Sequence, residues 1–186
     1  MTSTINQRGF AAPGEEYSGF AKLMHWTIAA CVLFMIPAGI AMANLPDGDL
    51  KNALYTLHRS TGVLVLALML IRLAYRLING VPAPEPTLTT FQRVVSSIVH
   101  LALYGLLIAQ PIIGWVATSA YGAQISVFGL FTLPAIVAKD EALAKPLFEV
   151  HELIGFAIAG LLVMHIGAAL FHYFIRRDGV LQRMLP

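Results

Sequence analysis

The chain has 186 residues, of which 58% are hydrophobic and only 12% are charged. Soluble globular domains are close to half apolar and a quarter charged, so this composition excludes an ordinary soluble protein and indicates an integral membrane protein. The net charge of +2 gives no reason to expect a nucleic-acid partner. The single cysteine, Cys31, excludes an internal disulfide, and because no CxxC or CxxCH motif occurs, neither covalent c-type haem nor an iron–sulfur cluster is expected.

Four apolar stretches are long enough to cross a hydrocarbon core, which needs roughly 20 helical residues. The sequence predicts the four helices at about residues 21–43, 53–77, 94–119 and 147–175. Joints rich in Asn, Gly and Pro at 44–49 and 79–86 end the first two helices. The third joint, 120–146, holds a short apolar patch at 127–137, which we expect either in the membrane interface or covering the outer end of the protein.

The predicted fold class is therefore all-α: an integral membrane four-helix bundle over residues 17–186, preceded by a disordered cytoplasmic tail at 1–16. Lysine and arginine predict its direction, because the cytoplasmic side carries the excess of both. The tails and the second joint hold the larger group, which comprises Arg8, Lys22, Arg72, Arg76, Arg93, Arg176, Arg177 and Arg183. The opposite side holds Lys51, Arg59, Lys139 and Lys145. Both termini are thus expected in the cytoplasm.

A cleaved signal peptide is an alternative for the first span, because Ala41-Met42-Ala43 has the form of a cleavage site after an apolar stretch. The tail before this span is long for such a signal and contains Glu15 and Glu16. We therefore favour a retained membrane helix.

Histidines are the most informative polar residues. All six lie in or at the ends of the predicted spans, where ionisable side chains are rare and usually functional. His151 and His165 are fourteen residues apart on the fourth span, which corresponds to about 21 Å along a helix and to nearly the same face. His58 is expected at the depth of His151, and His25 at the depth of His165. The sequence predicts two cross-helix pairs, although any single histidine could instead serve only to join helices by hydrogen bonds.

Two such pairs favour two haems b, since haem iron takes axial histidines from opposite sides of its ring and helix bundles build such sites from facing side chains. A zinc site is less suitable, because zinc ligands gather in one place. A porphyrin also needs a small residue one turn from each ligand. Four positions after the proposed ligands stand Ala29, Gly62, Gly155 and Ala169, whereas Tyr104 and Arg176 follow His100 and His172.

Haem propionates need cations nearby. Arg72 and Arg76 are the candidates at the inner pair, and Arg59 with Lys51 at the outer pair. The alternative is that the two inner arginines only anchor the helix at the headgroups.

Several segments together carry a family resemblance. They are Leu23-Met24-His25-Trp26, Leu57-His58-Arg59-Ser60-Thr61-Gly62, His100-Leu101-Ala102-Leu103-Tyr104, Gln110-Pro111-Ile112-Ile113-Gly114, Phe128-Gly129-Leu130, His151-Glu152 and Arg183-Met184-Leu185-Pro186. From about Tyr17 to its end the chain resembles the prokaryotic di-haem cytochrome b561 family, and within it the superoxide oxidase (superoxide:ubiquinone oxidoreductase) branch. The membrane cytochrome subunits of formate dehydrogenases and nickel–iron hydrogenases look similar.

The resemblance implies that superoxide is oxidised at the periplasmic face and that electrons pass through two haems to ubiquinone on the cytoplasmic side. Arg59 and Lys51 would then attract superoxide, since a cationic surface raises the on-rate of an anion. His172, Arg72, Arg76 and Trp26 suit the quinone site, and His100 suits a packing role. The partners expected are membrane lipid, ubiquinone and superoxide. The alternatives are an electron-transfer subunit that links a dehydrogenase or hydrogenase to the quinone pool, or a haem-free transporter or assembly factor.

Overall fold

The computed structural model describes residues 16–186 and is mostly helical. Four long helices are each long and apolar enough to cross a membrane. They are α1 (Gly19–Asn44), α2 (Asp49–Asn79), α3 (Thr90–Tyr121) and α4 (Glu141–Phe171). A small antiparallel hairpin of β1 (Ile125–Val127) and β2 (Phe131–Leu133) joins α3 to α4, and α4 is followed by a π-helical turn, η1 (His172–Arg176), and a 3-10 turn, η2 (Gln182–Met184).

The four predicted spans are confirmed as helices, and each helix begins a few residues before the apolar run. Polar caps account for these early starts. Thr89 forms a capping box with Gln92 at the start of α3, and Asp140 accepts hydrogen bonds from two backbone N–H groups of α4. Because such caps satisfy the unpaired N–H groups of a first turn, the helices extend through polar residues at their ends. The predicted tail, apart from Glu16, lies outside the described residues.

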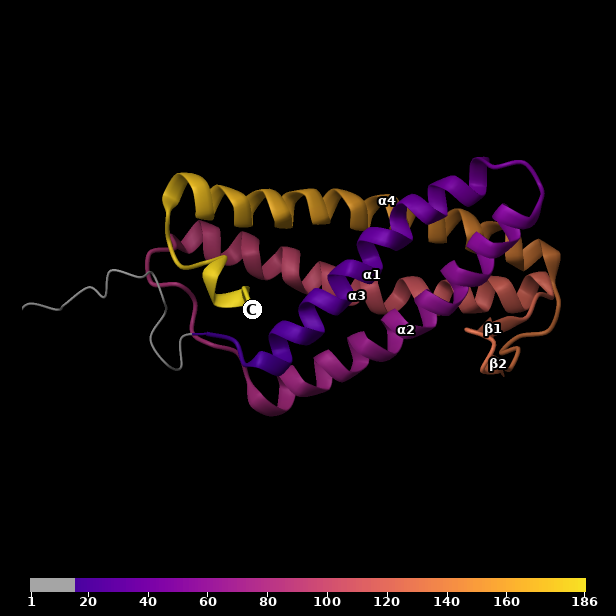
Figure 1. Cartoon of the computed structure of the whole chain (residues 1–186), viewed down its shortest axis with the longest axis horizontal. Coiled ribbons are helices and arrows are strands. Elements are labelled where there is room, and N and C mark those ends of the chain that lie inside the picture. Colours follow the sequence, from indigo (N-terminus) through magenta and orange to yellow (C-terminus); the bar gives the residue numbers. More distant parts are fainter. Residues whose placement is uncertain (1–15) are drawn as a thin grey trace, which may run out of the picture.

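The helices run side by side along the long axis of the molecule (Figure 1). The start of α1 and the C-terminus lie at one end, which we call the inner end, and the β-hairpin lies at the opposite, outer end (Figure 1). α4 packs mainly on α3, while α2 packs on both α1 and α3. The helix α4 runs from the outer end to the inner end of the bundle (Figure 1).

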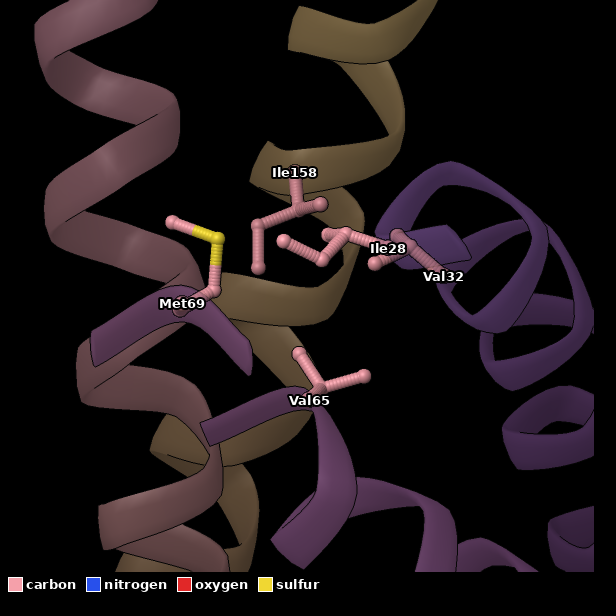
Figure 2. Packing of buried hydrophobic residues seen from close by; sticks show 5 residues of the cluster. All are labelled: Ile28, Val32, Val65, Met69 and Ile158. Carbon is pink, nitrogen blue, oxygen red and sulfur yellow. The ribbon is translucent and has the colours of Figure 1, made fainter. Parts of the chain in front are cut away.

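A buried apolar cluster fills the middle of the bundle. It consists of Ile28 and Val32 from α1, Val65 and Met69 from α2, and Ile158 from α4 (Figure 2). Ile158 is seven residues from His151 and seven from His165, so the cluster lies between the two histidine levels. Most other large apolar side chains are exposed on the outside of the bundle, which suits contact with lipid.

The apolar patch expected at 127–137 forms much of the hairpin and packs against α2. Ser60, whose exposed fraction is only 1%, holds it there: its Oγ donates to the Ser126 carbonyl at 3.0 Å and accepts from the Phe128 N–H at 3.0 Å. The turn uses left-handed backbone at Phe128 (φ 49°) and Gly129 (φ 73°). The hairpin thus covers α2 next to His58, because Ser60, which binds the hairpin, is two residues after His58.

Candidate functional site

The outer histidine pair comes from α2 and α4. The ring centres of His58 and His151 are 6.2 Å apart, with their planes inclined at 68°. Nδ1 of His151 is 3.1 Å from the Gln110 carbonyl oxygen of α3, and the Gln110 side-chain amide donates to the His151 carbonyl at 2.7 Å. Since Nδ1–H donates to this carbonyl, the lone pair of His151 is on Nε2, the arrangement found in metal-ligating histidines. Within residues 16–186, the buried Nδ1 of His58 has no hydrogen-bond partner.

Two glycines let the helices approach these imidazoles. A Cβ atom added at Gly114 of α3 would lie 2.9 Å from Cε1 and 3.2 Å from Nδ1 of His151. A Cβ added at Gly39 of α1 would lie 3.4 Å from Cε1 of His58. The His151 ring therefore packs against the backbone of α3 at Gly114, and the His58 ring against the backbone of α1 at Gly39. These contacts limit the positions that the two rings can take.

The inner end brings three imidazoles together. The ring centres of His25 (α1) and His165 (α4) are 6.0 Å apart, with planes inclined at 65°. His100 of α3 lies closer still, 5.3 Å from the His165 ring, and its Nδ1 is 3.4 Å from Ser96 Oγ. The rings of the predicted inner pair thus lie edge-on to each other, with one ring from α1 and one from α4. His100 is their immediate neighbour on α3.

Arg72 and Arg76 of α2 both lie near Tyr104 of α3. Nε of Arg72 donates to the Tyr104 hydroxyl at 2.9 Å, and the two guanidinium carbons lie 5.8 Å and 5.4 Å from the centre of its ring. Because only Nε of Arg72 is engaged by this bond, its terminal NH₂ groups keep donors for an anion. The sequence does not predict these contacts of Tyr104, because they depend on how α2 and α3 pack against each other.

His172 and Trp26, the other predicted inner residues, contact the C-terminal segment. His172 has an exposed fraction of 7%, and its Nδ1 is 2.6 Å from Oδ2 of Asp178. Trp26 stacks edge-on against His25 with ring centres 5.4 Å apart, and its indole N–H donates to the Met184 carbonyl at 2.8 Å. No sequence signal had marked Asp178, because the turn that brings it to His172 is visible only in the structure.

The outer cations differ in how far their charges are compensated. Lys51 pairs with Asp47 at 2.9 Å, and Lys139 pairs with Glu141 at 2.9 Å. The hydrogen bond to Glu141 raises the pKa of Lys139 above its ordinary value. Arg59 is half-buried beside His58, with its guanidinium 5.3 Å from the Tyr55 ring centre, and it forms no ion pair with an acidic side chain among residues 16–186. Arg59 is therefore the stronger candidate for an anion at this end.

Comparison with known proteins connects this arrangement to a family. The family model described as prokaryotic cytochrome b561 matches residues 16–186. The chain belongs to the prokaryotic cytochrome b561 family. It is 36% identical over 178 residues to cytochrome b561 homolog 2 of Escherichia coli K12, covering 95% of this chain and 94% of that protein. It is 32% identical to cytochrome b561 homolog 1 of the same organism (88% and 93% covered), and 28% identical to the probable superoxide oxidase CybB of Yersinia pestis (92% and 97% covered).

Cytochrome b561 proteins are membrane electron-transfer proteins that bind b-type haem. The histidine pairs can be tested against that group. Two imidazoles that bind one metal ion from opposite sides, through bonds of about 2.0–2.1 Å, place their ring centres roughly 6.3 Å apart. The outer and inner pairs, at 6.2 Å and 6.0 Å, fit this separation, whereas the 5.3 Å between His100 and His165 is too short for it. The separations therefore fit a haem at each pair, which His58 with His151, and His25 with His165, would hold.

Proposed function

We propose that this cytochrome b561 oxidises superoxide at its outer, periplasmic end and reduces ubiquinone at its inner, cytoplasmic end. Two superoxide anions each lose one electron and become dioxygen, and one ubiquinone takes up those two electrons with two protons to become ubiquinol. Two haems b, when bound, supply the one-electron redox chemistry that joins the two half-reactions.

The observation that carries this proposal is the pair of two-histidine sites at the two levels of α4. Their separations of 6.2 Å and 6.0 Å both suit an iron with two axial imidazoles. A haem held by two histidines would be suited to passing electrons rather than to binding oxygen. Because the two levels are about 21 Å apart along α4, a donor at one face and an acceptor at the other are served by one chain.

The outer end supplies a cation for superoxide. Arg59 follows the proposed ligand His58 directly, and within the described part of the chain it has no carboxylate partner such as Asp47 is for Lys51. A small anion approaching a site with an uncompensated positive charge binds faster, by tenfold or more in favourable clefts. Arg59 thus has the larger proposed role, and Lys51 contributes to the surrounding field.

The inner end supplies the groups expected of a quinone site. Arg72 and Arg76 offer hydrogen-bond donors for propionates or for quinone oxygens, and Trp26 closes over His25. His172 is the candidate proton donor, because its Nδ1 is held by Asp178 and its Nε2 is left to carry a proton toward a ligand. The excess of arginine at this end supports a cytoplasmic location for both termini in a bacterial inner membrane.

A second function is favoured by the names of the relatives. The two Escherichia coli proteins, at 36% and 32% identity, are named only as cytochrome b561 homologs, and the superoxide oxidase name comes at 28% identity. The alternative is an electron-transfer subunit that passes electrons between a dehydrogenase or hydrogenase and the quinone pool. Such a subunit would exchange electrons with quinol and would be indifferent to superoxide.

The proposal is tested by comparing Arg59→Ala with Lys139→Ala in stopped-flow mixing with superoxide. Lys139 is the matched control, since it is a more exposed outer cation that already has a carboxylate partner. We expect Arg59→Ala to slow superoxide-driven haem reduction about tenfold while quinol-driven reduction is unchanged, and Lys139→Ala to leave both rates unchanged. Equal superoxide rates in all three proteins, with haem content preserved, would remove Arg59 from the site. No response of the wild-type protein to superoxide would favour the subunit.

A further inference from the structure

We propose that His172 and Asp178 form a proton-donating dyad at the quinone site, in which Asp178 is a positioning residue. This inference rests on the proposed function and names a residue that supports its inner half-reaction. The two side chains are both buried, with exposed fractions of 9% and 7%, and Nδ1 of His172 is 2.6 Å from Oδ2 of Asp178. They form a short ion pair or hydrogen bond at the inner end of the helix that also carries His151 and His165.

The backbone is shaped to make this contact. α4 is followed by the π-helical turn His172–Arg176, a rare form that is frequently found at functional sites. Arg177 then takes left-handed backbone (φ 54°, ψ 41°), which is uncommon for a residue other than glycine. This reversal lets the Asp178 N–H donate to the His172 carbonyl at 3.3 Å, so the same two residues are joined through both backbone and side chains.

Asp178 is itself held by other donors. Its Oδ2 is 3.2 Å from Nε of Arg176, and its Oδ1 accepts from the Val180 N–H at 3.2 Å. A carboxylate fixed by three donors cannot rotate away from the imidazole. The carbonyl groups at the C-terminus of α4 need donors, so the Asp178 carboxylate, which only accepts, does not cap that helix. Its three bonds instead hold it beside His172.

The chemistry follows from which ring nitrogen is engaged. With Nδ1–H donating to the carboxylate, Nε2 is the nitrogen left for a ligand, and it has no hydrogen-bond partner among the described residues. In the imidazolium form Nε2 also carries a proton, while Nδ1–H stays hydrogen-bonded to Asp178. As a bound quinone gains an electron, the Nε2–H bond breaks and a quinone O–H bond forms, leaving neutral imidazole still bound to Asp178. Nε2 is then reprotonated from water at the inner end, and a second electron and proton complete the quinol.

The experiment compares Asp178→Asn with Asp140→Asn, the same substitution at the cap of the opposite end of α4. Asn caps a helix about as well as Asp, so the control should be neutral. Each protein, carrying its haems, is reduced chemically and mixed with a short-chain ubiquinone, so the result does not depend on superoxide. We expect Asp178→Asn to slow haem reoxidation about tenfold to a hundredfold at saturating quinone, with KM little changed and a larger solvent deuterium isotope effect.

Asp178→Glu should recover part of the rate, since it keeps a carboxylate. A wild-type rate at saturating quinone in Asp178→Asn would overturn the dyad, and so would a change confined to KM. Failure of the proposed function would look different, because it would abolish superoxide-driven reduction in the unmodified protein while leaving this reoxidation step intact.

A second measurement needs no functional variant. Nitrogen-15 NMR of the reduced, histidine-labelled wild-type protein in lipid nanodiscs reports which ring nitrogens of His172 carry protons. We expect a proton on Nδ1 in a strong hydrogen bond. A His172 with bare Nδ1 and a proton only on Nε2 would overturn the proposal even if Asp178→Asn did not retain haem.

Discussion

Substitution of Gly114 by alanine is expected to weaken the outer haem selectively. The added Cβ would lie 2.9 Å from Cε1 of His151, about 0.5 Å inside ordinary van der Waals contact. The ring cannot simply move aside, because its Nδ1 is bonded to the Gln110 carbonyl at 3.1 Å. Overpacking of this kind costs about 1–3 kcal/mol. That cost corresponds to outer-haem affinity roughly 5-fold to 150-fold weaker.

Haem titration of the purified apoprotein measures this effect. The wild-type protein should take up two haems with similar affinity, whereas Gly114→Ala should fill the inner site first and the outer site only at higher haem concentration. Gly105→Ala is the matched control on the same helix, since a Cβ there meets nothing within 4 Å. If Gly114→Ala bound both haems as tightly as the control, with unchanged low-spin spectra, the close packing of His151 against α3 would not support the outer site as we describe it.

Three further substitutions test other parts of the account. His151→Ala should lose the outer haem and keep the inner one, and a haem content that stayed at two would show the pairing to be wrong. Ser60→Ala should leave the Phe128 N–H and the Ser126 carbonyl without their partner, lowering the unfolding free energy by about 1–3 kcal/mol. An unchanged Tm would contradict the stabilising role of these two hydrogen bonds. Ile158→Ala should cost about 2–5 kcal/mol through a cavity in the central cluster, measured against a lipid-facing leucine-to-alanine control, and equal losses in the two variants would argue against that cluster.

The four helices could be predicted because their signal is a single physical requirement. A segment that crosses a hydrocarbon core must be long and apolar, and breakers must separate one segment from the next. The helix ends were less predictable. α4 begins at Glu141, six residues before the expected 147, because Asp140 caps it and the following polar residues continue the helix outside the apolar run.

The histidine pairs could be predicted because helix geometry converts sequence separation into depth and face. The fourteen residues between His151 and His165 on α4 set the two levels, and His58 and His25 lie opposite them. The closeness of His100 to His165 was not predicted, since the rotation of α3 about its axis cannot be read from one sequence. The contacts of Gln110 with His151 and of Asp178 with His172 were missed for a related reason. Both depend on how a backbone bends or turns at one place.

Mixing the wild-type protein with superoxide, after its haem content per chain has been counted, tests the central claim most directly. The account predicts two haems per chain that are reduced within the mixing time and reoxidised on addition of ubiquinone, with two superoxide anions consumed for each ubiquinol formed. Two haems that ignore superoxide yet accept electrons from ubiquinol would contradict superoxide oxidation and identify the chain as an electron-transfer subunit. A protein without a haem absorbance band after haem-replete expression would contradict the sites themselves.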